Sequence, residues 1–133
     1  MAGGLDISYI PQSADFLEGT LRDYARGCGI DYTLLLTVLR QLDFDRVQFE
    51  KRMETYSEGQ KKKVLLAGSL CERANLYIWD EPLNFIDVFS RMQLEQVICR
   101  YCPTMILVEH DQTFAGKVAT KVLELDVGTE SLQ

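Results

Sequence analysis

The sequence lacks any long hydrophobic run. None of its apolar stretches approaches the roughly 18–20 residues that a membrane-spanning helix needs. Its first residues, Met1–Asp6, also lack the positive start and the apolar core of a secretory signal. Both absences favour a cytoplasmic protein.

Positive charge is scarce as well. The chain has 14 lysine and arginine residues against 20 aspartate and glutamate residues, which gives a net charge of −6. Free-standing binding to nucleic acid or to an anionic membrane requires a basic field, so the charge balance argues against both. With 133 residues, 47% of them hydrophobic, the chain is long enough for one packed domain of ordinary size.

Cysteine and histidine are too few for a four-ligand zinc site close together in the sequence. Cys28, Cys71, Cys99 and Cys102 are accompanied by one histidine. Cys99 and Cys102 have CxxC spacing, but there is no second such pair, and this one falls at the end of an expected helix rather than at its start. Metal and redox chemistry are therefore disfavoured, and we expect reduced, mostly buried thiols.

Apolar periodicity predicts an α/β fold. We expect strands at 5–11, 76–79, 104–108 and 121–125, and helices at 17–26, 31–42, 45–53, 57–73, 88–101 and 111–118. Asp31 is a good N-cap, and Ser57 and Gln60 have the spacing of a capping box. Because helices and strands alternate from residue 57 onward, the sheet should be mainly parallel.

The most informative segment is 76–81, LYIWDE, an apolar run that ends in two adjacent carboxylates. Such a run is typical of a buried parallel strand. Asp80 and Glu81 would then lie at the carboxyl edge of the sheet, where open α/β sheets bind ligands. Since an uncompensated buried carboxylate is costly, a cation or a reacting water is the natural partner. Taken alone, such a segment is more often a strand followed by an acidic turn, and the neighbouring motifs decide otherwise here.

The start of the expected helix at residue 57 is a second candidate site. Ser57 and Gly59 stand where free backbone N–H groups and the positive end of the helix dipole suit a phosphate. An ordinary capped helix has the same pattern. The adjacent lysines, Lys61–Lys63, also suggest phosphate binding, but a solvated cationic turn is the favoured interpretation.

These segments belong to a set of five motifs in a specific order. The set consists of Gln12 after the first strand, Tyr56–Gln60, Asp80–Glu81, Asn84–Asp87 and His110 after another strand. The order resembles that of the ATP-binding cassette (ABC) family: Q-loop, signature motif, Walker B with its glutamate, D-loop and switch histidine. The resemblance covers residues 9 to 111.

The resemblance implies a role for each residue of the hydrolytic centre. Asp80 would hold Mg²⁺ through water, and Gln12 would reach the metal or the attacking water. Glu81 would polarise or orient that water, while His110 would contact the γ-phosphate.

It also implies that this chain acts with a second ABC ATPase domain, in the same polypeptide or in a dimer mate. Ser57, Gly59 and Gln60 would contact the γ-phosphate of ATP held on that opposite domain. Asp87, in the D-loop, would couple the two composite sites. ATP and Mg²⁺ are the implied cofactors of the full-length protein.

Departures from the usual motifs narrow the resemblance. The usual LSGGQ is YSEGQ here, so the carboxylate of Glu58 replaces a glycine beside the phosphate site and would repel the phosphate unless it points outward. The segment 84–87, NFID, is closer to the D-loop of ABC-F proteins than to that of many transporters. The strings YSEGQKKKVLLA, WDEPLNFIDVFSR and LVEHDQTF are similar to the second ATPase domain of Lsa-type ABC-F proteins, a ribosome-protecting antibiotic-resistance group. The ribosome is thus an implied partner of the full-length protein.

The sequence has no G-x-x-x-x-G-K-[ST] phosphate loop. The chain therefore resembles a partial P-loop ABC domain that lacks the phosphate-loop strand. We expect a strand and Q-loop at 1–12, a helical subdomain at 13–56 and the C-terminal half of the ATPase core at 57–133. Without the loop, the chain alone should bind neither ATP nor Mg²⁺ tightly and should have negligible ATPase activity.

Two alternatives to an ABC-F ATPase remain. One is the ATPase subunit of an ABC transporter, which has the same chemistry but a membrane partner; the compact segment 13–56 and Asn84 favour ABC-F over it. The other is a non-catalytic half-site or oligomerisation module. A missing central strand would leave an exposed sheet edge, and such edges promote pairing between chains.

Overall fold

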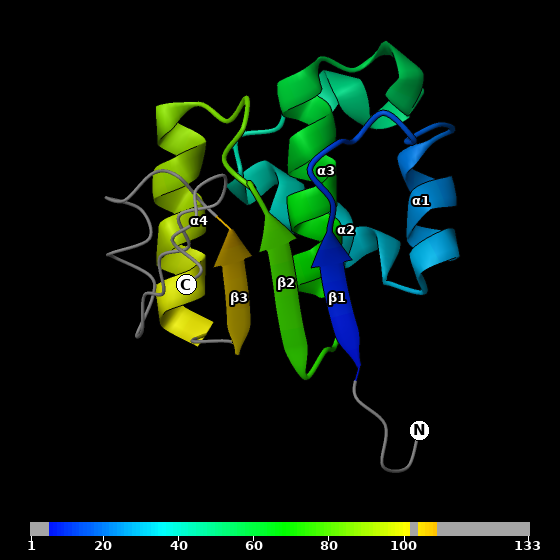
Figure 1. Cartoon of the computed structure of the whole chain (residues 1–133). Coiled ribbons are helices and arrows are strands. Elements are labelled where there is room, and N and C mark those ends of the chain that lie inside the picture. The colour runs from blue at the N-terminus through cyan, green and yellow to red at the C-terminus, as the bar shows by residue number, and fades with distance from the viewer. Residues whose placement is uncertain (1–5, 102–103, 109–133) are drawn as a thin grey trace, which may run out of the picture.

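A three-stranded parallel sheet organises the chain. The computed structural model describes residues 6–101 and 104–108. Its strands are β1 (Ile7–Ile10), β2 (Leu76–Asp80) and β3 (Met105–Val108), in the order β1-β2-β3 (Figure 1). All three run in the same direction, so their carboxyl ends meet at one edge. The predicted α/β fold with a parallel sheet is confirmed; the expected elements at 111–118 and 121–125 lie outside the described residues.

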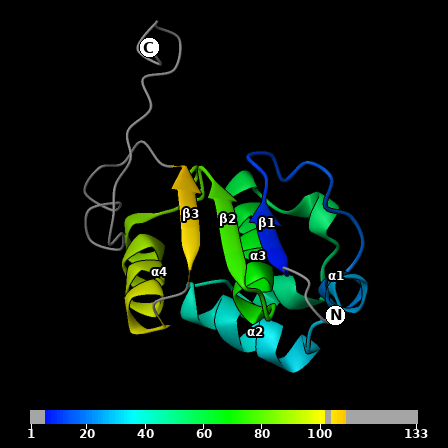
Figure 2. The ribbon, with the colours of Figure 1, turned by 60° about the horizontal axis from the view of Figure 1, so that its bottom comes forward.

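Helices pack on one face of this sheet. The helical elements are α1 (Leu21–Cys28), α2 (Tyr32–Gln41), the short 3₁₀ helices η1 (Arg46–Glu50) and η2 (Met53–Thr55), α3 (Glu58–Cys71) and α4 (Val88–Tyr101). Helix α3 contacts β1 and α2, and α4 lies beside β3 in both views (Figures 1 and 2). Helix α3 is thus the central helix, with the sheet on one side and α2 on the other.

Side-chain caps fix where the helices begin. Asp31 accepts a hydrogen bond from the backbone of Thr33 at the start of α2, and Ser57 and Gln60 form the reciprocal capping box of α3. Both predictions are confirmed. Helix α1 begins later than expected because Thr20 and Asp23 form a capping box of their own there.

The predicted helix at 45–53 is wrong. Residues 46–50 form a 3₁₀ helix, and the chain is extended again at Lys51. The phenol of Tyr56 donates to the Gln48 carbonyl at 2.7 Å, and the rings of Phe44, Phe49 and Tyr56 pack together. These tertiary contacts override the local helical pattern because they hold the chain in another path.

The core lies between the sheet and α3. The indole of Trp79 is fully buried and donates to Ser69 Oγ of α3 at 2.8 Å. Ser8 Oγ of β1 lies 2.6 Å from the same Ser69 Oγ and donates to the Glu72 carboxylate. One serine of α3 therefore joins the two strands that carry the candidate site.

None of the helices in the ranges 6–101 and 104–108 is both long and apolar enough to cross a membrane.

The cysteines of the described residues are thiols. Cys28 and Cys71 are free and half-buried, and burial raises the pKa of Cys71 to about 11. Cys99 is exposed, so the expectation of mostly buried thiols is wrong for that residue.

Candidate functional site

The carboxyl ends of β1 and β2 bring three of the predicted site residues to one edge. Ile10 and Trp79 are register partners; Gln12 follows Ile10 by two positions, and Glu81 follows Trp79 by two. Asp80 ends β2 and is paired with Val108 of β3. Figure 1 shows the arrowheads of all three strands at this end of the sheet. His110 lies outside the described residues, so its place relative to these three stays a prediction.

Glu81 has an unusual backbone conformation. Its φ of +50° lies in the left-handed region, which costs about 1–3 kcal/mol for a residue with a side chain. Its N–H donates to the Val108 carbonyl at 2.7 Å, and the Asn84 amide donates to its carboxylate at 3.2 Å. These bonds hold the turn after β2 and fix the direction of a carboxylate that is only half-buried.

A buried lysine joins the loops after β1 and β2. Lys62 of α3 is 1% exposed, and its ammonium donates to the carbonyl of Gln12 at 3.0 Å and to that of Glu81 at 3.3 Å. The expected solvated cationic turn is therefore wrong at Lys62, and it is also wrong at Lys63, which is buried too. The reason is the central position of α3: both aliphatic stems are covered, and the charged ends reach loop acceptors.

The signature motif lies at the amino end of α3. Ser57 Oγ accepts from the Gln60 N–H at 3.1 Å, and the Gln60 side chain accepts from the Ser57 N–H at 2.8 Å. The Gln60 amide oxygen is thus engaged within the chain. Glu58 is exposed in the first helical turn, where a carboxylate is stabilised by the helix dipole.

Gly59 has a packing role that the motif alone did not reveal. A Cβ atom at this position would lie 2.6 Å from the carbonyl oxygen of Phe85 in the D-loop, closer than real Cβ contacts allow. Phe85 itself has a φ of +67°. The D-loop backbone therefore presses directly on the start of α3, and only glycine permits that approach.

Asp87 completes the D-loop contact with α3. Its carboxylate accepts from the Ser90 N–H at 3.0 Å and from Ser90 Oγ at 2.8 Å, and it lies 3.0 Å from Lys63 Nζ. Partial burial opposes its ionisation, but the bonds from Ser90 and Lys63 outweigh this and lower the pKa of Asp87 to about 2. Sequence reasoning missed Lys63 and Ser90, although the D-x-x-S spacing is that of a helix cap.

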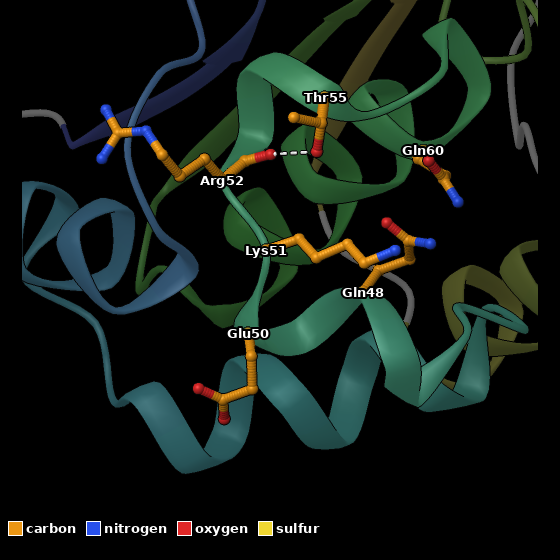
Figure 3. A pocket seen from close by; sticks show the side chains of 6 residues that line it. All are labelled: Gln48, Glu50, Lys51, Arg52, Thr55 and Gln60. Carbon is orange, nitrogen blue, oxygen red and sulfur yellow. Dashed lines mark hydrogen bonds between the residues drawn. The ribbon is translucent and has the colours of Figure 1, made fainter.

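A shallow depression lies next to the signature motif. It has a volume of about 530 Å³ and is lined by Gln48, Glu50, Lys51, Arg52, Thr55 and Gln60. Figure 3 shows the tips of Gln48, Lys51 and Gln60 on the same side, with Glu50 and Arg52 directed elsewhere. Arg52 pairs with Glu54 at 2.9 Å. The side chains that meet here are polar and one of them is the cation Lys51, so the depression suits a polar group.

The residues at the sheet edge fit magnesium better than zinc. Within residues 6–101 and 104–108, no group of three or more histidine, cysteine or acidic residues is placed to hold a metal ion. Mg²⁺ does not require such a cage, because it keeps several waters and uses one or two carboxylates together with substrate phosphates. Asp80, Glu81 and the amide oxygen of Gln12 are oxygen donors of the required type.

Comparison with known proteins identifies the family. The model of the "ABC transporter" family matches residues 4–84 of this chain. The chain therefore belongs to the ABC transporter family, as its five motifs predicted.

Individual relatives point to one branch. The "Ribosome protection protein VmlR" of Bacillus subtilis (strain 168) is 33% identical over 86 residues, which is 65% of this chain and 16% of VmlR. The "ABC transporter F family member 4" of Arabidopsis thaliana is 30% identical over 88 residues, 66% of this chain and 12% of that protein. The chain is thus related to ABC-F proteins.

A solved structure shows the same fold. One chain of the structure "Model of ribosome-bound archaeal Pelota and ABCE1" superposes with a TM-score of 0.70 at 21% identity and covers 86% of this chain and 20% of that chain. The chain spans only 12% to 22% of the length of the curated relatives that it matches.

Proposed function

We propose that this chain provides the hydrolytic and signature elements of an ABC-F type ATPase. The observation that carries the proposal is the meeting of Gln12, Asp80 and Glu81 at one sheet edge, on strands packed against the helix that begins with the signature motif. One chain then faces two nucleotides. The sheet edge serves the nucleotide of its own domain, and the start of α3 serves the nucleotide of a second ABC domain.

Each residue does what its chemistry allows. Asp80 and Gln12 would hold Mg²⁺ through oxygen atoms or water, and the ion would neutralise charge on the phosphates. Glu81 accepts a hydrogen bond from the attacking water and aligns it with the γ-phosphate. The N–H group of Gly59 donates to the γ-phosphate of the opposite nucleotide, with the side chains of Ser57 and Gln60 beside it. His110 contacts the γ-phosphate of the first nucleotide, and Asp87 connects the two sites.

The full-length protein acts on the ribosome in the cytoplasm, in a ribosome-protection role linked to antibiotic resistance. The relatedness to ABC-F proteins, one of which carries ribosome protection in its name, supports this proposal over that of a transporter subunit. The absence of a phosphate loop from the sequence supports a further point: the 133-residue chain alone does not turn over ATP. Measurable Mg²⁺-dependent turnover by the rigorously purified chain would contradict that point.

Replacement of Glu81 tests the hydrolytic assignment. In the full-length protein, Glu81→Gln keeps the shape of the side chain but removes the carboxylate, so the ATPase rate should fall roughly 10²-fold or more. ATP binding should persist, and the variant should remain on ribosomes in the presence of ATP in sedimentation assays. Glu18→Gln is the matched control, because Glu18 is exposed and lies outside the site. Hydrolysis by Glu81→Gln at the wild-type rate would refute the assignment.

A further inference from the structure

One buried cation connects three elements of the site. Lys62 lies on α3 and donates hydrogen bonds to Gln12 after β1 and to Glu81 after β2. Both bonds go to backbone carbonyls, so they fix the path of each loop whatever its side chain does. The carbonyls come from positions 50 and 19 residues away in the sequence, which makes the link a product of the fold rather than of local geometry.

Helix α3 gives Lys62 a rigid base. The capping box of Ser57 and Gln60 fixes its first turn, and Gly59 is in close contact with the Phe85 carbonyl. Lys62 follows directly in the next turn and is 1% exposed. Its ammonium is therefore held at a defined place beneath the sheet edge, unlike that of a mobile surface lysine.

We propose that Lys62 is a positioning residue for ATP hydrolysis, which holds the Q-loop and the turn of Glu81 in fixed register with the signature helix. The proposal rests on the proposed function, since it assigns no new chemistry to the site. It adds that the start of α3, which serves the opposite nucleotide, and the loops that serve the domain's own nucleotide move as one unit. Lys62 itself does not contact nucleotide.

The backbone of Glu81 explains why this contact affects rate. Its left-handed φ of +50° is held from both ends: the N–H donates to Val108, and the carbonyl accepts from Lys62. If the second bond is lost, the residue can relax toward the ordinary right-handed region and its carboxylate changes direction. The attacking water is sensitive to such changes, because misplacement by about 1 Å can lower a rate by about 100-fold.

The experiment compares Lys62→Met with Lys61→Met in the full-length protein. Both substitutions remove one positive charge from α3, but only Lys62 reaches the two loops. Lys62→Met should lower kcat by about 10- to 100-fold while KM for ATP changes by less than about threefold, and Lys61→Met should leave both near wild type. Denaturant titration of each variant gives the folded fraction by which the rates are corrected. If Lys62→Met does not fold, Lys62→Gln replaces it in the same comparison; its side chain is polar but shorter than that of lysine and uncharged, so kcat should again fall while KM for ATP stays within about threefold.

A double-mutant cycle separates positioning from a general structural effect. In a Glu81→Gln background, Lys62→Met should lower the rate of single-turnover phosphate release by less than about twofold, because the carboxylate that Lys62 positions is already absent. An equal loss in both backgrounds, or an unchanged kcat in folded Lys62→Met, would overturn the proposal. If the full-length wild-type protein does not hydrolyse ATP, or if its Glu81→Gln variant is fully active, the proposed function is refuted. A large Glu81→Gln effect without a Lys62→Met effect rejects the positioning role alone.

Discussion

Two glycines in helices should respond in opposite directions to the same substitution. At Gly59, an added Cβ would lie 2.6 Å from the Phe85 carbonyl oxygen, so the D-loop backbone or the start of α3 must move by several tenths of an ångström. Overpacking of this kind costs about 1–3 kcal/mol, against a gain of up to about 1 kcal/mol from the better helix propensity of alanine. We therefore expect Gly59→Ala to lower the free energy of unfolding by about 1 kcal/mol or more.

Gly27 is the matched control. It lies in α1, and nothing stands within 4 Å of the Cβ that alanine would add. Gly27→Ala should raise the free energy of unfolding by about 0.4–1 kcal/mol, because it reduces the entropy of the unfolded chain without strain in the native state. Trp79 is the only tryptophan and is fully buried, so its fluorescence during urea titration reports the transition directly. Equal or stabilising effects at both glycines would refute the contact between Gly59 and the D-loop.

Two further predictions concern the D-loop and the sheet edge. Asp87→Asn should lower the free energy of unfolding by less than about 1 kcal/mol at pH 7, since the Asp87 side chain is 49% exposed. Its folded-state pKa of about 2 lies below the ordinary value of 3.8, so the stabilising effect is complete above about pH 4 and fades as the pH falls towards 2. The difference in urea midpoint between wild type and Asp87→Asn should therefore be smaller at pH 3 than at pH 7. The same difference at both pH values would exclude the ionised carboxylate as the cause. The chain should also self-associate through β3, which is an edge strand of the sheet formed by residues 6–101 and 104–108. Ile106→Lys, at an exposed position of that strand, should reduce the mass seen by light scattering, and a wild-type monomer at high concentration would contradict this.

Much of the frame around the site could be predicted from local sequence. The apolar run before Asp80 predicted the parallel strand β2, although only Trp79 of that strand is buried and its other residues are half-buried. The Ser57–Gln60 spacing predicted the capping box that starts α3. Both features depend on residues within one turn or one strand, where periodicity and capping chemistry are sufficient. The helix 88–101 was predicted with its observed bounds for the same reason.

The predictions that were wrong or missing concern features that depend on contacts between distant segments. Lys62 and Lys63 were expected in solvent because charged side chains usually are, yet both are buried. The ammonium of Lys62 reaches the loops after β1 and β2, and that of Lys63 reaches the Asp43 carbonyl and the Asp87 carboxylate. One sequence signal was present: Lys62 stands four residues before Leu66, on the same face of the helix as this core residue. The contact of Gly59 with Phe85 had no local signal, since it depends on how the D-loop crosses the start of α3.

A lysine beneath the sheet edge suits the electrostatics of this site. The carboxyl ends of parallel strands present backbone carbonyls, and here Asp80 and Glu81 add two carboxylates to the same edge. A nucleotide would add further negative charge. An apolar residue at position 62 would leave the carbonyls of Gln12 and Glu81 without this donor, whereas an ammonium satisfies both and attracts the nearby anions. Because Lys62 lies on α3, the donor that holds both loops at the sheet edge belongs to the same helix that begins with the Ser57–Gln60 capping box.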